Sequence, residues 1–84
     1  MIIYKYPLEF GKTNTVPDGS IIHFGKDGNG QICAWIALQT KEEKDEVGLY
    51  IIGTGMPFDD DHIPLLSFVD EYGCVWHLIM DWTD

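Results

Sequence analysis

The sequence contains no arginine, and apart from three histidines its only basic side chains are five lysines. Against these stand 14 Asp and Glu residues, which give the 84-residue chain a formal net charge of -9. A negative field of this size repels phosphate, and without arginine the chain lacks the planar donor pair that grips phosphate at two oxygens. We therefore expect no direct nucleic-acid partner and no attraction to anionic lipid.

Long hydrophobic runs are also missing. No stretch is long and apolar enough to span a membrane as a helix, and the first residues have neither the basic start nor the unbroken apolar run of a secretion signal. These absences predict a cytoplasmic protein without membrane contact. The only two cysteines, Cys33 and Cys74, lie inside apolar segments. We expect both to be buried free thiols, with no structural disulfide.

No long segment repeats its apolar residues with the period of a helix, whereas several short segments alternate with the period of a strand. The sequence therefore predicts one all-β domain, residues 1–84, with about six short antiparallel strands. A meander, a small sandwich and a partly closed barrel all fit this pattern. The expected strands cover residues 2–10, 21–25, 31–39, 49–52, 65–69 and 74–82.

Proline and glycine indicate how these strands are joined. Pro7 cannot donate a ladder hydrogen bond, which predicts an edge position or a bulge for the first strand. Residues 11–20 form a polar connection, in which Pro17-Asp18-Gly19 is typical of a turn. Residues 26–30 and 70–73 carry the turn residues of two hairpins, and residues 40–48 indicate a solvated charged loop.

Two apolar surfaces predict self-association as a homodimer. Residues 32–38 are apolar on both faces, which indicates a central strand that is covered either by the rest of the chain or by a second subunit. In the last strand, alternate residues share one apolar face: Trp76, Leu78, Met80 and Trp82.

Five short pieces, spread in order over nearly the whole chain, carry a family resemblance. They are residues 3–9 (IYKYPLE), 16–23 (VPDGSIIH), 33–35 (CAW), 53–57 (GTGMP) and 75–78 (VWHL). In this combination the chain resembles a family of small uncharacterised proteins found in bacteriophages and prophages. That family usually has histidine at the position of Met56. The resemblance implies a phage origin and an all-β fold, and it supplies no known active site.

The acidic residues are grouped, which makes them the first candidate site. One group is Glu42, Glu43, Asp45 and Glu46, and another is Asp59, Asp60 and Asp61. Together they predict an acidic face that binds a basic partner, although charged loops on a solvated surface explain the same residues equally well.

A glycine-containing loop after the fourth expected strand is the second candidate. Its residues Gly53, Thr54, Gly55, Met56 and Phe58 indicate either a tight bend or the wall of a small-ligand pocket. Neither the acidic run ending at His62 nor Cys33 with a histidine has the spacing or partners of a metal or catalytic site. We therefore expect no bound metal, no cofactor and no enzymatic activity.

These observations favour a non-enzymatic phage accessory protein that inhibits or modulates a basic host protein, such as a component of host defence. A protein that sequesters a small ligand or a nucleotide signal is the alternative. A minor virion or assembly component is a third hypothesis.

Overall fold

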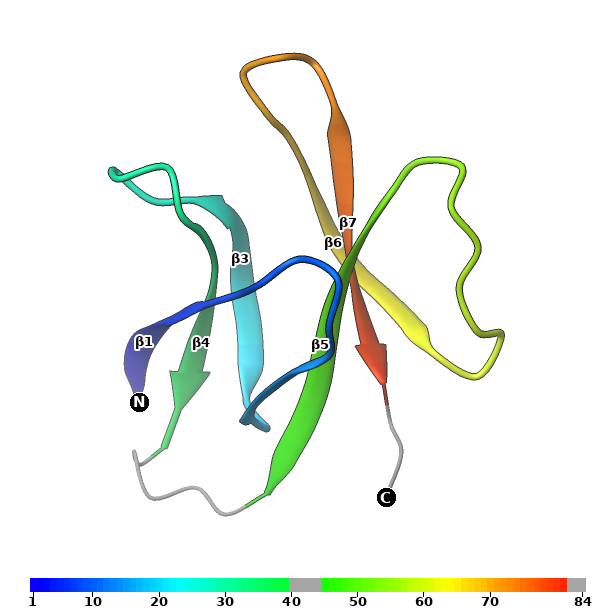
Figure 1. Ribbon diagram of the computed structural model, residues 1–84. Helices are drawn as coiled ribbons and strands as arrows, with labels where there is room; N and C mark the ends of the chain where they lie inside the picture. The colour runs from blue at the N-terminus through cyan, green and yellow to red at the C-terminus, as the bar shows by residue number, and fades with distance from the viewer. Residues whose placement is uncertain (40–44, 82–84) are drawn as a thin grey trace.

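The computed structural model describes residues 1–39 and 45–81, and within them the chain forms seven strands and no helix (Figure 1). The strands are β1 (Ile2–Pro7), β2 (Asn14–Pro17), β3 (Ser20–Lys26), β4 (Ile32–Leu38), β5 (Glu46–Gly53), β6 (Ile63–Val69) and β7 (Val75–Asp81). They build a three-stranded sheet of order β1-β4-β3 and a four-stranded sheet of order β2-β5-β7-β6. All strand pairs are antiparallel, so the all-β prediction is confirmed, and of the three arrangements the open sandwich is correct.

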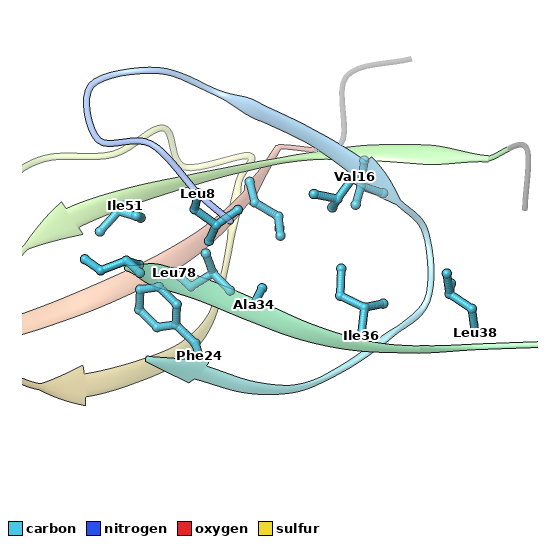
Figure 2. Close-up of a cluster of buried hydrophobic side chains, with 11 residues drawn as sticks. Leu8, Val16, Phe24, Ala34, Ile36, Leu38, Ile51 and Leu78 are labelled. Carbon is cyan, nitrogen blue, oxygen red and sulfur yellow. The ribbon is translucent and has the colours of Figure 1, made fainter. Parts of the chain in front are cut away.

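Alternating apolar residues hold the two sheets together. Ile32, Ala34, Ile36 and Leu38 of β4 belong with Val47, Leu49 and Ile51 of β5 to one buried apolar core, which is drawn in Figure 2. The face of β7 that carries Trp76, Leu78 and Met80 also turns into this core. The expectation that this apolar stripe is a dimer surface is therefore wrong for these three residues, and Trp82 lies outside the described residues. The homodimer itself stays a prediction.

Both predicted hairpins are confirmed, and their turns are built alike. In each turn an aspartate, Asp27 or Asp70, accepts two backbone N–H groups through one carboxylate oxygen. Three residues later Gly30 (φ 80°) or Gly73 (φ 83°) adopts the left-handed conformation. This is the three-residue hairpin loop that needs glycine at its last position. Lys5 also donates to Asp27, and mainly for this reason the pKa of Asp27 falls to about 2.

Several local expectations are met and others are not. β1 is an edge strand, as Pro7 predicts, and β4 is central. Cys33 is buried, but Cys74 is exposed because it precedes the first residue of β7 and belongs to the turn. Strand β2 lies within residues 11–20, which the sequence predicts to be a polar connection, and β5 begins three residues earlier than predicted. The two strands β2 and β5 pair with each other, and Val16 lies opposite Val47, which is 31 positions further along the sequence.

Asn14 is the buried polar side chain of the described core, and it fixes the point where the chain passes from one sheet to the other. Its side-chain oxygen accepts the N–H of Glu9 at 2.9 Å. Its side-chain nitrogen donates to the carbonyls of Glu9, Lys12 and Leu49 at 3.1, 3.3 and 3.1 Å. The amide thus ties the connection between β1 and β2 to β5.

We expect Asn14→Ala to lower the free energy of unfolding by about 1–3 kcal/mol, because backbone groups of Glu9 and Leu49 would lose their partner inside the protein. Urea unfolding followed by tryptophan fluorescence measures the change. Asn29→Ala removes the same atoms from an exposed turn and serves as the matched control. Equal stability of the two variants would contradict this role of Asn14.

Candidate functional site

The connection between β5 and β6, residues 54–62, crosses the outer face of the four-stranded sheet; we call it the crossover loop. Strands β5 and β6 run in the same direction on either side of β7, so the chain must return along the length of the sheet to begin β6. In Figure 1 it is the yellow-green trace from the end of β5 to the start of β6. Beneath it, Ile52 and Ile79 are 7% and 0% exposed although they lie outside the core cluster between the sheets.

A tight turn starts the crossover loop and places its side chains. The N–H of Met56 donates to the carbonyl of Gly53 at 3.1 Å, and Gly55 between them has φ 93°. This is the pattern of a type II turn, in which the third residue must tolerate positive φ. The N–H of Gly53 in turn lies 3.2 Å from the sulfur of Met56. Residues 53–56 therefore form the bend that the sequence indicates.

The same loop also borders a cavity of about 260 Å³. Its wall includes all five residues of the candidate ligand loop, namely Gly53, Thr54, Gly55, Met56 and Phe58, together with Ile52, Pro64, His77 and Ile79. The cavity is thus apolar on its floor, and it carries a polar pair, Thr54 and His77, on its wall.

His77 is held between two hydroxyl groups. Thr54 Oγ1 lies 2.7 Å from its Nε2, and Ser67 Oγ lies 2.7 Å from its Nδ1. A neutral imidazole has one donor and one acceptor nitrogen, so one hydroxyl donates to the ring and the other accepts from it. The three side chains come from the crossover loop, β6 and β7, and they fix the turn to the sheet.

A second cavity, of about 380 Å³, borders the same Met56 and Ile52. Its wall adds Gly11, Lys12 and Thr13 from the connection between β1 and β2, with Tyr50, Ile51 and His62. Met56 therefore lines both cavities, and its flexible side chain is about half exposed.

A hydrogen-bonded chain anchors the far end of the crossover loop. The hydroxyl of Tyr50 lies 2.6 Å from Nδ1 of His62, and Nε2 of His62 lies 3.2 Å from the carboxylate of Asp81. The carboxylate only accepts, so Nε2 carries a proton; in the neutral ring Nδ1 then accepts from Tyr50. Burial, as the main cause, raises the pKa of Tyr50. The phenol is thus kept protonated, which is the opposite of what a nucleophile needs.

The acidic residues lie at one end of the four-stranded sheet, where β5 begins, β7 ends and β6 begins. Asp45 and Glu46 are at the start of β5, and Asp59, Asp60 and Asp61 precede β6; all five are exposed. Glu42 and Glu43 lie outside the described residues. The three described lysines are engaged elsewhere, in the ion pairs Lys5–Asp27, Lys12–Glu9 and Lys26–Glu71.

Candidate metal ligands and nucleophiles do not converge in residues 1–39 and 45–81. No three His, Cys, Asp or Glu side chains gather there in a way that could hold a metal ion. His62 turns to Tyr50 and Asp81, while Asp59 accepts the N–H of Asp61 within its own turn. The thiol of Cys33 contacts Gln31 and Asp27, and burial raises its pKa.

Sequence reasoning missed the residues that complete this site: Lys12, Thr13, Tyr50, His62, Ser67 and His77. Strand alternation does place His77 on the strand face opposite to that of Leu78, which is a weak indication that His77 lies outside the core. The contacts themselves join residues 10 to 23 positions apart. A pattern of neighbouring residues in the sequence cannot predict such contacts.

Fold and site together define a small open β-sandwich with a crossover loop that covers two cavities on one outer face. The described residues contain no helix that could cross a membrane. The model of a family described as a domain of unknown function, DUF7352, matches residues 1–84, and the chain belongs to this family. No curated protein and no solved structure matches the chain.

Removing the hydroxyl of Tyr50 should loosen the anchored end of the crossover loop. We expect Tyr50→Phe to speed exchange of the His62 amide hydrogen about 2- to 10-fold, the factor that one hydrogen bond supplies to local opening. That amide donates to the carbonyl of Asp59 at 3.0 Å, so NMR hydrogen exchange can follow it. Tyr72→Phe, at an exposed turn, is the control. Unchanged exchange at His62 would show that Tyr50 does not anchor the loop.

Proposed function

We propose that the protein is a non-enzymatic binding protein that holds a small ligand beneath the crossover loop. The observation that carries this proposal is the convergence of residues 53–56, Phe58 and His77 on one cavity. Pockets of this kind are concave and mostly apolar, with a few fixed polar groups that orient the ligand. Burial raises the pKa of Tyr50 and of Cys33, which keeps both groups protonated and makes them poor nucleophiles.

The chemistry of the wall indicates an amphipathic ligand. Ile52, Ile79 and Phe58 offer apolar contact, while the Thr54 hydroxyl, which His77 holds in place through one hydrogen bond, can make a further hydrogen bond to a ligand. A larger ligand reaches the second cavity if Met56 changes rotamer, since that side chain borders both. Lys12, which lines the second cavity, is the cation there, and Glu9 pairs with it. This balance favours a neutral or weakly anionic compound, such as a nucleoside or a nucleotide with few phosphates.

A thermal-shift screen of nucleosides and nucleotides, followed by calorimetry, tests the proposal. For a compound that binds, we expect Thr54→Val to weaken the affinity about 5-fold, because valine keeps the shape of threonine and removes one hydrogen-bonding group. Thr15→Val makes the same change on β2, outside both cavities. If no compound shifts the melting temperature, or both variants bind alike, the pocket is not the site of action.

The resemblance to phage proteins supports a setting for this activity. We propose that the protein acts in the cytoplasm of an infected bacterium, where removal of a small signalling molecule would serve the phage. The proposed location in an infected bacterium therefore rests on the resemblance, and the proposed ligand binding rests on the cavity.

Docking to a basic host protein is the second candidate function. Its support is the position of Glu46, Asp59, Asp60 and Asp61 at one end of a sheet, while the three described lysines form their ion pairs with Asp27, Glu9 and Glu71. A surface of this kind speeds association with a basic partner at low salt.

Neutralising part of this end should slow such docking. With a basic protein captured from bacterial lysate, we expect Asp60→Asn/Asp61→Asn to lower the association rate on the order of 10-fold at low salt and little at high salt. Asn29→Lys/Tyr72→Lys changes the net charge equally at two exposed turn residues outside the three cavities. Surface plasmon resonance gives both rates. Equal slowing by the two double variants would mean that net charge, and not this end of the sheet, attracts the partner.

A further inference from the structure

A separate cavity of about 450 Å³ lies beside the two hairpin turns. Its wall combines three parts of the chain: residues 8–10 after β1, Lys26 with residues 30–32 around the β3–β4 turn, and Asp70 with Trp76 around the β6–β7 turn. It shares no residue with the two cavities beneath the crossover loop. The acidic residues before β6 lie toward the other end of the sheet.

Two aromatic rings form one wall of this cavity. Phe10 and Trp76 meet edge to face, with ring centroids 5.1 Å apart. Phe10 is 52% exposed, which is a large apolar surface to leave in water. Beneath the rings, the buried Leu8 and Ile32 close the floor. The rings therefore present an aromatic surface at an open cavity.

The polar groups of the cavity carry negative charge. Asp70 accepts the indole N–H of Trp76 at 3.0 Å, and mainly this bond lowers the pKa of Asp70, so the carboxylate stays ionised. Glu9 is the second lining carboxylate, and its ion pair with Lys12 is solvent-exposed and weak. The one lining cation, Lys26, is bound by both oxygens of Glu71 at 2.7 and 3.0 Å.

Gln31 adds a hydrogen-bond acceptor to this negative wall. Its side-chain nitrogen donates to the backbone carbonyls of Leu8 and Ile32, both at 3.0 Å. Both amide hydrogens are thereby used, so the side-chain oxygen is the group left to bind a ligand, and it can only accept. A cation with N–H donors fits such a wall.

We propose that this cavity binds a guanidinium cation, of which the arginine side chain is the reference. A guanidinium is planar and weakly hydrated, so it stacks on aromatic rings such as Phe10 and Trp76 while its edge donates hydrogen bonds to Glu9 and Gln31. A lysine ammonium is more strongly hydrated and lacks the planar face. Anions are repelled by Glu9 and Asp70. The ligand is either a free guanidinium compound or an arginine on a partner protein.

Titration of the ¹⁵N-labelled protein with acetyl-arginine amide tests the proposal. The expected result is a saturable shift of the Trp76 indole N–H signal. Acetyl-citrulline amide, which has nearly the same shape without the charge, should bind at least about 10-fold more weakly, and acetyl-lysine amide should also bind more weakly. No saturable shift, or equal affinity for the citrulline compound, would overturn the proposal.

Two variants locate the site. Phe10→Ala and Glu9→Gln should each weaken binding about 5-fold. Both side chains are exposed, so the fold is retained, and the amide spectrum verifies this. Tyr72→Ala, 83% exposed and outside the cavity, is the control. If both variants bind as tightly as the parent, the guanidinium binds elsewhere and the assignment is wrong.

A short peptide with a central arginine distinguishes the two ligand sources. Binding at least 10-fold tighter than acetyl-arginine amide would identify an arginine on a partner protein, because peptide backbone then adds contacts. Equal affinity would identify a free guanidinium compound.

Discussion

The amide of Asn14 is the interaction on which the arrangement of this protein depends most. A buried amide is stable only when its hydrogen bonds are made, and Asn14 makes them to the backbone on both sides of the passage between the sheets. The segment that it holds, residues 8–13, then contributes to cavities on two sides of the molecule. Leu8, Glu9 and Phe10 line the cavity at the hairpin turns, and Gly11, Lys12 and Thr13 line one beneath the crossover loop.

Strand order provides the second constraint. Because β7 lies between β5 and β6, their connection cannot be a tight turn and must lie over the sheet. This geometry buries Ile52 and Ile79 on a face that would otherwise meet water, and it brings His62 and His77 next to hydroxyl groups. The side chains beneath the crossover loop thus hold this irregular segment in place, and they also form the polar part of the wall of each cavity.

Local chemistry made part of this fold predictable. The aspartate and glycine of each hairpin turn act within a few residues, so both hairpins follow from the sequence, and Pro7 marks an edge strand because it lacks a donor. Strand β2 could not be found in this way, since its partner strand β5 lies far along the chain and half of its own four residues are polar. The stripe of Trp76, Leu78 and Met80 was recognisable as apolar. Which way it faced was not, because alternation defines two faces and does not say which one meets the second sheet.

The sequence by itself determined an acidic all-β protein with apolar strands and charged turns, because composition and period-two alternation are properties of neighbouring residues. It also singled out the bend at residues 53–56, where glycine is required by backbone geometry. Only the tertiary structure decided that this bend closes a cavity with His77, that Phe10 lies beside Trp76, and that the described lysines pair with Asp27, Glu9 and Glu71. The physical reason is that these contacts depend on how two sheets and one long crossover are placed in space, and residues far apart in sequence become neighbours only then.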